Sequence, residues 1–367
     1  MTVKTGQTTY DSSETCVRQS AAPQHVPFKS DGILQALGNT PLVRLRRFLD
    51  DHTVKLFAKL ESFNPGGSAK DRPAIRMIEQ ALKSGKIDSD TTVIESSSGN
   101  MGVALSQICR YHSMRFICVV DPNAQLHNVS IMRALGAEIV RVDQMVDGSY
   151  LAARWRRVRE LLNTSENSFW PNQYANLENP KSHEATIREI CRDSEDGFDY
   201  LFVATSSTGT ATGCQNFLHR INHPAKVIAV DAIGSVLFGG TAGPRRIPGL
   251  GAGCEPALAV GKSFDGLYRV SNVDCVVGCR RAAEREAILV GGSGGGVLQT
   301  IRYLGDKLAG KTCVAILHDS GYRYLDTIFN DDWVKDATSL KAPEIRYLAG
   351  IETRKSSNEN DLRSEVG

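Results

Sequence analysis

Hydrophobic residues recur along this chain with two different spacings that alternate from segment to segment. The run 115–120 (Arg-Phe-Ile-Cys-Val-Val) is almost continuously apolar, which is typical of a strand covered on both faces. In the segment 73–82 the apolar positions instead recur as on one face of a helix. Strands that alternate with helices of this length predict parallel sheets with right-handed crossovers. We therefore expect an α/β fold.

The predicted elements form two series, one in each half of the chain. In the first series we predict strands at 54–61, 92–95, 115–120 and 138–142, and helices at 73–82, 102–111, 128–135 and 150–162. In the second we predict strands at 200–204, 226–231, 275–277 and 312–317, and helices after 209, at 279–287 and at 297–308. No repeat of fixed period is present, which argues against a solenoid.

The turn at 64–73 (Asn-Pro-Gly-Gly-Ser-Ala-Lys-Asp-Arg-Pro) places a lysine at a strand-to-helix corner. Pro73 suits the first turn of a helix, because a backbone N–H would have no partner there. A loop in this position can present Lys70 to a pocket. By itself the turn is more typical of a helix start with a solvated lysine, so its meaning depends on other segments.

Three glycine- and hydroxyl-rich turns lead into predicted helices, at 95–102, 205–213 and 291–296. In open α/β sheets such turns lie beyond the carboxyl ends of the strands, where ligands bind. Their N–H groups and the helix N-termini behind them favour anions. Neither a GxGxxG after the first strand nor a GxxxxGK[ST] is present. Each turn alone fits a tight connection equally well, but together with Lys70 they favour a shared anionic ligand.

Composition and charge narrow the possible partners. Of 367 residues, 41% are hydrophobic and 23% are charged, the net charge is +2, and no basic block stands out, so we expect no nucleic-acid partner. No apolar run reaches the ~20 residues that span a bilayer, so we expect no membrane partner. Nine cysteines without a CxxC pair favour reduced thiols in the cytoplasm. No metal-ligand spacing occurs, and we expect no metal.

Several motifs together resemble the fold-type II pyridoxal-phosphate enzymes of the cysteine synthase and cystathionine β-synthase family. They are Gly-Asn-Thr-Pro-Leu at 38–42, the turn at 64–72, which matches N-P-x-G-S-x-K-D-R, and Ser-Gly-Asn at 98–100. The resemblance covers about Leu34 to Phe329. It implies two domains, each with a twisted, mostly parallel sheet flanked by helices, and pyridoxal 5′-phosphate in the cleft between them.

The resemblance also implies roles for individual residues. Lys70 would hold the cofactor as a Schiff base and then act as acid and base at the substrate Cα. Asn100 would hydrogen-bond the cofactor 3′-oxygen, and Ser293 would face its pyridine nitrogen. Ser97 and Ser98 would bind the substrate carboxylate. The cofactor phosphate would lie against a turn that is poorer in glycine than is usual in the family, formed by Ser206, Ser207, Thr208, Gly209 and Thr210.

Departures from typical cysteine synthases indicate a branch of the family. Where those enzymes carry M-P-x-x-M-S, this chain has Val-Val-Asp-Pro-Asn at 119–123, and the segments 170–176, 230–236 and 322–326 also differ. These segments resemble a branch that serves staphyloferrin B siderophore assembly. Its members join O-phospho-L-serine to L-glutamate through an α-aminoacrylate and release phosphate, on the way to 2,3-diaminopropionate. The resemblance therefore implies a transferase that works by β-replacement.

Two anionic substrates require cations and polar groups. Arg245 and Arg246 are candidates because arginine can bind phosphate or carboxylate bidentately, although an arginine pair is also common in a solvated loop. Tyr174 stands where the family has an aromatic residue beside the substrate, next to Gln173. It is a candidate catalytic residue, with packing as the alternative role.

Three other functions stay open at this point. The same cofactor could serve a cysteine synthase that uses O-acetylserine or phosphoserine with sulfide, or a β-eliminating enzyme that releases pyruvate. A regulatory relative without cofactor is the remaining possibility, which the presence of Lys70, Asn100 and Ser293 disfavours.

The resemblance also implies the domain organisation. We expect a disordered leader at 1–29, a large cofactor-binding domain formed by 30–63 and 175–340, a small mobile domain at 64–174, and a C-terminal tail at 341–367. A twofold homodimer is expected as well.

Overall fold

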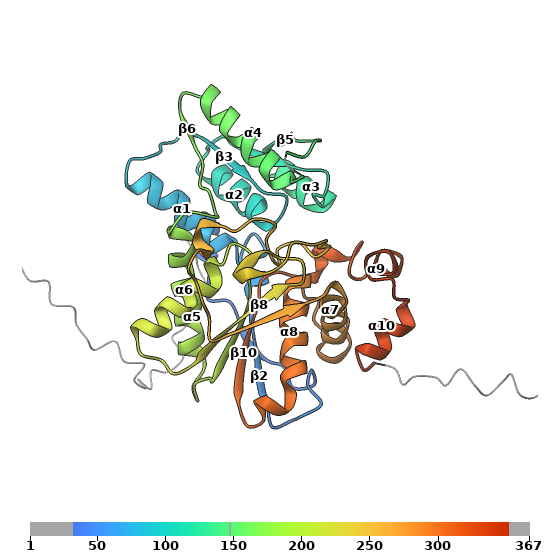
Figure 1. Ribbon diagram of the computed structural model, residues 1–367. Coiled ribbons are helices and arrows are strands. Elements are labelled where there is room, and N and C mark those ends of the chain that lie inside the picture. The colour runs from blue at the N-terminus through green and yellow to red at the C-terminus, as the bar shows by residue number, and fades with distance from the viewer. Residues whose placement is uncertain (1–31, 147, 352–367) are drawn as a thin grey trace, which may run out of the picture.

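The protein consists of two lobes, one above the other in Figure 1, each built around its own sheet. A computed structural model describes residues 32–146 and 148–351, so the leader expected at 1–29 lies outside the described residues. The sheets have the strand orders β1-β2-β10-β7-β8-β9 and β5-β4-β3-β6. Every pairing of these strands is parallel except that of β1 with β2. The predicted α/β fold with two mostly parallel sheets is confirmed.

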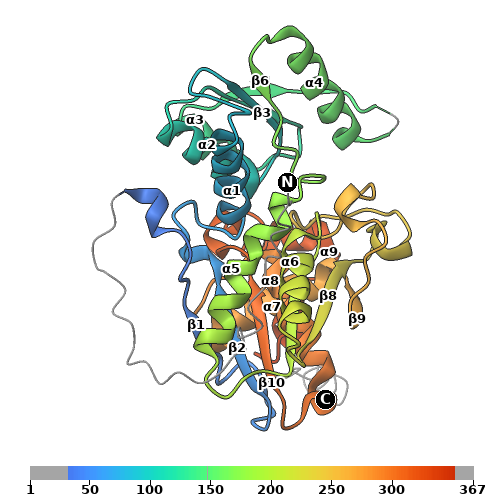
Figure 2. The ribbon, with the colours of Figure 1, turned by 90° about the vertical axis from the view of Figure 1, so that its left-hand side faces the viewer.

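The larger lobe has a six-stranded sheet between two layers of helices. Its strands are β1 (Leu42–Arg44), β2 (Lys55–Leu60), β7 (Tyr200–Ala204), β8 (Lys226–Ala232), β9 (Gly266–Val270) and β10 (Thr312–Leu317). One face is covered by α5 (Glu178–Asp193) and α6 (Gly209–Arg220), and the other by α7 (Asn272–Glu286) and α8 (Gly292–Leu304) (Figures 1 and 2). The alternating side chains of β10 divide between these layers, because Val314 joins the core under α5 and α6 whereas Ala315 joins the core under α7 and α8.

The smaller lobe follows the same plan with a four-stranded sheet. Its strands are β3 (Thr92–Ser96), β4 (Phe116–Val120), β5 (Glu138–Arg141) and β6 (Ser168–Phe169). The core on one face contains Met77, Leu105 and Phe116, and that on the other contains Ile94 and Val158. The helices of this lobe are α1 (Asp71–Lys83), α2 (Asn100–Tyr111), α3 (Leu126–Ala134) and α4 (Tyr150–Thr164).

The strand predicted at 275–277 is wrong, because these residues lie inside α7. The helix begins earlier, at a capping box formed by Ser271 and Asp274, and the strand of this region is β9 instead. Cys275, Val276 and Val277 are all buried within the helical layer. A three-residue apolar run therefore fitted a buried strand and a buried helix equally well.

The glycine-rich segment 291–296 is also not a loop, because α8 already begins at Gly292. A side chain at Gly295 would overlap the carbonyl oxygen of Cys275 in α7, and one at Gly278 would overlap the carbonyl oxygen of Gly295. These glycines let the backbones of α7 and α8 come into contact. The prediction mistook close helix packing for a turn.

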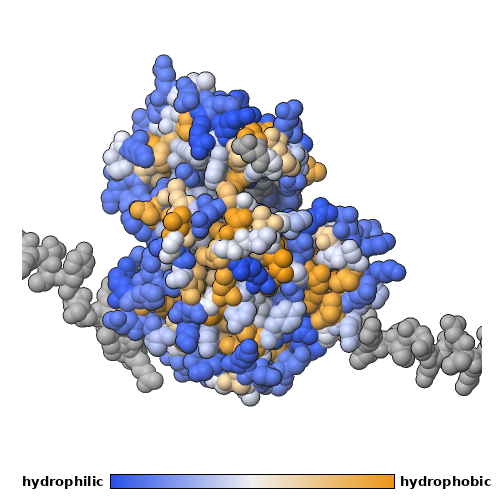
Figure 3. Space-filling model, viewed as in Figure 1, coloured by the Kyte–Doolittle hydropathy of each residue, from blue (hydrophilic) through white to orange (hydrophobic). Residues whose placement is uncertain are grey.

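Beyond α8, two short helices extend the larger lobe, α9 (Asp331–Thr338) and α10 (Ala342–Leu348). α10 lies within the segment expected to form a tail, and its Ile345 is buried in the core of the larger lobe, together with Ala349. None of the helices in the described part of the chain is long and apolar enough to cross a membrane. On the face shown in Figure 3, hydrophilic residues cover much of both lobes.

Candidate active site

A cavity of about 550 Å³ lies between the two lobes and is lined by residues of both. It opens beyond the carboxyl ends of β3, β4, β7 and β10, as expected for a ligand site in parallel sheets. The structure brings every predicted site residue to this cavity: Lys70, Ser97, Ser98, Asn100, Gln173, Tyr174, Ser206, Ser207, Thr208, Gly209, Thr210, Arg245, Arg246 and Ser293.

Lys70 is the last residue before α1, on a turn that hydrogen bonds hold in place. Asn64 is buried, and its Nδ2 donates to the carbonyl oxygens of Glu61 (2.9 Å) and Ser68 (3.2 Å). The N–H of Ala69 donates to the carbonyl oxygen of His318 at the end of β10 (2.8 Å). Burial lowers the pKa of Lys70, which favours the neutral amine needed for a nucleophile or base.

Arg72, two residues further on, ties the smaller lobe to the larger one. Its guanidinium is buried, and it donates to Glu61 (2.7 and 2.8 Å) and to both carboxylate oxygens of Glu189 in α5 (2.8 Å each). Two bidentate pairs on one arginine specify a single orientation. The start of α1, and with it Lys70, is thereby positioned against the larger lobe.

Asn100 opens α2 and belongs to a partly buried polar network that the sequence did not reveal. Its Nδ2 donates to Asp319 Oδ2 (2.7 Å), which also accepts a hydrogen bond from Tyr324 (2.6 Å). Arg323 donates to the Asn100 side-chain oxygen and to the carbonyl oxygen of Gly66. Asn100 thus keeps one N–H for a ligand, while Asp319 Oδ1 is buried without a partner. Burial raises the pKa of Asp319.

The N-terminus of α2 faces a cation that the sequence analysis missed. Ser97 Oγ accepts a hydrogen bond from the N–H of Gly102 (3.0 Å), leaving its own O–H available. Ser98 Oγ accepts one from Arg154 Nη1 (2.7 Å), and Arg154 Nε lies 3.2 Å from Asp121 Oδ2. Arg154 and Asp121 both line the cavity. This wall therefore combines a helix N-terminus, two hydroxyls and a guanidinium, all of which suit an anion.

The turn at 206–210 joins β7 to α6 and forms the opposite wall. Thr208 adopts a left-handed backbone conformation (φ 65°), and its Oγ1 is buried without a hydrogen-bond partner. A side chain at Gly209 would overlap Asn179, whose Nδ2 donates to Ser207 Oγ (3.3 Å). Thr210 Oγ1 lies 3.3 Å from His183 Nε2. A buried hydroxyl without a partner at a helix N-terminus is suited to an anionic group such as phosphate.

Glu95 anchors the segment that presents Gln173 and Tyr174. Its buried carboxylate accepts hydrogen bonds from Trp170 Nε1 (2.8 Å) and from the N–H of Gln173 (3.2 Å). Burial raises the pKa of Glu95 to about 7. The ring of Tyr174 meets that of Trp155 edge-on at 5.7 Å, next to Arg154 in α4.

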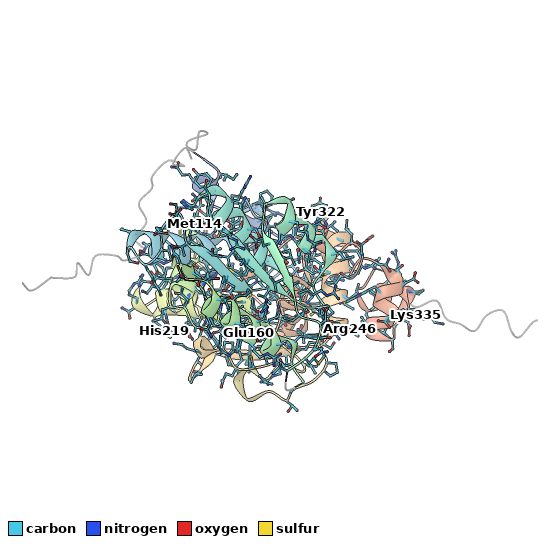
Figure 4. The ribbon with its side chains drawn as sticks, turned by 90° about the horizontal axis from the view of Figure 1, so that it is seen from above. Met114, Glu160, His219, Arg246, Tyr322 and Lys335 are labelled. Carbon is cyan, nitrogen blue, oxygen red and sulfur yellow. The ribbon has the colours of Figure 1, made fainter. Side chains whose placement is uncertain are left out.

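Arg245 and Arg246, both in the segment between β8 and β9, differ in their surroundings. Arg246 is half-exposed and is paired with Asp336 of α9. Figure 4 places Arg246 on the side of the molecule where Lys335 of α9 lies. Arg245 is more buried, and its Nη1 donates to the carbonyl oxygen of Leu250 (3.3 Å).

Comparison with known proteins identifies the family. The model for pyridoxal-phosphate dependent enzymes matches residues 33–319. This chain belongs to that family. A 42% identical relative from Ralstonia nicotianae, aligned over 84% of this chain and 93% of its own length, is N-(2-amino-2-carboxyethyl)-L-glutamate synthase.

Two solved enzyme structures are similar to this chain in both sequence and fold. A hydrogen sulfide-producing enzyme from Fusobacterium nucleatum is 32% identical, covers 81% of this chain and 100% of its own, and has a TM-score of 0.75. A cysteine synthase from Entamoeba histolytica is 26% identical, covers 92% of this chain and 100% of its own, and has a TM-score of 0.79.

The cofactor of the family is pyridoxal 5′-phosphate, and the cavity fits it. Lys70 supplies a desolvated amine, and Thr208 with the N-terminus of α6 supplies an anion site for the phosphate. Ser293, the second residue of α8, is buried and lines the cavity, where its hydroxyl suits a neutral ring nitrogen. Asn100 retains one N–H for the ring oxygen.

Proposed function

We propose that this chain catalyses β-replacement on O-phospho-L-serine with L-glutamate, releasing phosphate and forming N-(2-amino-2-carboxyethyl)-L-glutamate. The observation that carries the proposal is the pair of guanidinium groups, Arg154 and Arg245, that enter the cavity of Lys70 from opposite lobes. Phosphoserine brings a phosphate and a carboxylate, and glutamate brings two carboxylates. A cysteine synthase acting on an acetyl ester and sulfide has fewer anionic groups to bind.

When bound, pyridoxal 5′-phosphate supplies the electron sink that makes the Cα–H bond of an amino acid acidic. Lys70 removes the proton from Cα, and the phosphate leaves from Cβ with the electrons of the C–O bond. The amine of glutamate then forms a bond to Cβ, losing one proton, and Lys70 returns a proton to Cα. Lys70 acts as base and then as acid, so its lowered pKa suits both steps.

The other residues bind and orient the substrates. Ser97, Ser98 and the N-terminus of α2 bind the carboxylate of phosphoserine. Arg154, hydrogen-bonded to Ser98, lies where it can bind the phosphate of the same substrate. Tyr174 and Gln173, held by Glu95, close the side of the cavity between Arg154 and the β8–β9 segment.

The test is phosphate release by the purified holoenzyme. With phosphoserine as the first substrate, we expect release to depend on L-glutamate and the condensed product to appear in equal amount by mass spectrometry. Turnover that requires sulfide and gives cysteine would establish the alternative cysteine synthase. Pyruvate formation without a second substrate would instead establish a β-eliminating enzyme.

We also propose that the enzyme works as a homodimer in the cytoplasm and that its product is a precursor of 2,3-diaminopropionate. Buried free thiols support a reducing compartment, and the described residues contain six of them: Cys109, Cys118, Cys214, Cys275, Cys279 and Cys313. Sedimentation equilibrium on the full chain gives the oligomeric state, and a monomer would contradict the first part.

A further inference from the structure

Arg245 is held over the cavity by a segment with a fixed backbone. Within the segment between β8 and β9, the N–H of Gly251 donates to the carbonyl oxygen of Thr205 (2.7 Å), and the N–H of Ala252 donates to Ser235 Oγ (3.1 Å). The side chain of Arg245 reaches back to the carbonyl oxygen of Leu250. The guanidinium is therefore positioned before any ligand arrives, which limits the entropy cost of binding.

Arg245 differs from the other cavity arginines in having no ion-pair partner within the described residues. Arg154 is paired with Asp121, and Arg246 is paired with Asp336. The carboxylate of Asp231 acts on Arg245 electrostatically without forming an ion pair with it, and the Nε of Arg245, like that of Arg154, is buried without a hydrogen-bond partner. A partly desolvated guanidinium with open donors is a binding group for an anion, because leaving those donors unpaired is costly.

The position of Arg245 separates it from the binding residues of the first substrate. Arg154 reaches Ser98 from α4 in the smaller lobe, beside the start of α2. Arg245 comes from the larger lobe, in the segment whose Leu258 N–H donates to the carbonyl oxygen of Tyr174 (3.1 Å). Burial raises the pKa of the Tyr174 hydroxyl, and the charges of Arg154 and Arg245 both oppose this rise, so both guanidinium groups lie near this side chain.

We infer that Arg245 binds the side-chain carboxylate of the incoming amino acid and so selects a dicarboxylic second substrate. This inference rests on the proposed function. The amine of the second substrate must reach Cβ of the first, beside Lys70, so its distal carboxylate extends away from the reacting atoms. A forked guanidinium binds a carboxylate through two parallel hydrogen bonds, which an uncharged amide side chain cannot match. Arg245 thereby distinguishes glutamate from glutamine.

The experiment measures Arg245→Gln against the wild-type holoenzyme, with each substrate varied at saturating levels of the other. We expect the KM for L-glutamate to rise about 10- to 100-fold, the loss for a hydrogen-bonded charged pair, while the KM for phosphoserine changes by less than about three-fold. The preference for L-glutamate over L-glutamine should fall by a similar factor. Arg245→Lys keeps the charge without the fork, and we expect an intermediate KM.

Two matched variants and a binding measurement complete the test. The positive charge of Arg246 is balanced by Asp336, so Arg246→Gln should raise the KM for glutamate less than Arg245→Gln does. Arg133→Gln removes the same charge from an exposed position on α3 and controls for the net charge. Calorimetric titration of the holoenzymes with L-glutamate should show the same order of weakening, and thermal unfolding shows whether each variant is folded.

An equal rise in the KM of both substrates, or an unchanged choice between glutamate and glutamine in the folded variants, would overturn the inference. If the wild type itself shows no glutamate-dependent phosphate release, the proposed function fails instead. The two failures are therefore distinguishable within one set of assays.

Discussion

The deep wall of the larger lobe and the wall of the smaller lobe face the same cavity with different chemistry. The deep wall of the larger lobe presents two neutral hydroxyl groups. They belong to Thr208, the N-cap residue of α6, and to Ser293, the second residue of α8. The smaller lobe presents charged side chains that already have partners, as in the pair formed by Arg154 and Asp121. Hydroxyl groups and helix N-termini without a partner suit a ligand that remains bound. A charged side chain that has an alternative partner can instead release its ligand at little cost.

We therefore expect cofactor affinity and substrate affinity to depend largely on separate residues. A variant that removes the hydroxyl of Thr208 or Ser293 should lose cofactor, and a variant that removes the charge of Arg154 should lose substrate. Lys70 serves both ligands, since it lies at the junction of the lobes between α1 and the end of β10. Two further residues cross the division, because we propose that Arg245 of the larger lobe binds substrate and that Asn100 of the smaller lobe binds cofactor.

Lys70→Ala gives the largest expected effect because it removes a function on which both walls depend. We expect turnover to fall by at least about 1,000-fold, the usual loss for a positioned acid and base. The visible absorbance of the lysine-bound cofactor should disappear as well. Phosphate-release assays and absorbance spectra measure the two effects, with the thermal unfolding midpoint as the control for folding. Retention of a tenth of the activity would contradict the assignment.

Glu95→Gln tests the smaller-lobe wall through the pH dependence of stability. Because the pKa of Glu95 in the folded state is about 7, above its ordinary value, the ionised form is disfavoured by folding. The wild type should therefore lose stability as the pH rises from about 4.5 to 7, by about 3 kcal/mol from this group. The neutral variant lacks that loss, so it should gain in free energy of unfolding relative to the wild type between pH 5 and pH 8.

Urea unfolding of both proteins across this pH range measures the difference. Asp71 also has a pKa of about 7 in the folded state, but its contribution is common to both proteins and cancels. A difference between wild type and variant that stays constant from pH 5 to pH 8 would show that Glu95 does not titrate there. In that case the Gln173–Tyr174 segment is held equally well at all these pH values.

Arg154→Gln should weaken the substrate and spare the cofactor. We expect the KM for phosphoserine to rise about 10- to 100-fold, because a charged hydrogen-bond donor to the substrate is lost. The dissociation constant of pyridoxal 5′-phosphate, measured by fluorescence titration of the apoenzyme, should change by less than about three-fold. Arg156→Gln on the same helix, where the arginine is exposed and pairs with Glu160, is the matched control. A comparable loss of cofactor affinity would show that the two walls are not separable.

Arg154 also shows why the sequence predicted the residues on turns better than those inside a helix. The 206–210 turn of the larger lobe and the 97–100 turn of the smaller lobe are contiguous motifs, and a turn between a strand and a helix has a predictable place at the sheet edge. Arg154 lies in α4 near three other arginines, 156, 157 and 159, and nothing in the helical pattern distinguishes the one that turns inward. Asp121 carried a usable signal, since it follows the buried strand β4 directly.

The remaining differences between prediction and structure have a common cause. Asp319 and Glu95 act through partners distant in sequence, Asn100 and Trp170, so no local pattern reveals them. The glycines of 291–296 were assigned to a loop because their contact with α7 is equally non-local. Local patterns therefore predicted the elements and the loop motifs, whereas the contacts between elements required the structure.

Gly209→Ala gives the smallest of these effects. It should weaken cofactor binding and spare substrate binding, which is the reverse of what we expect for Arg154→Gln. The added methyl group would overlap Asn179, which donates to Ser207 Oγ and to the carbonyl oxygen of Gln173 (2.7 Å), so the 206–210 turn must shift. We expect cofactor affinity to fall about 10-fold, in line with the ~1–3 kcal/mol cost of overpacking, with the KM for phosphoserine nearly unchanged. In an Asn179→Ala background the overlap is relieved, so the same substitution should cost less there. An equal cost in both backgrounds would mean that the methyl group acts on the bound cofactor directly rather than through the turn.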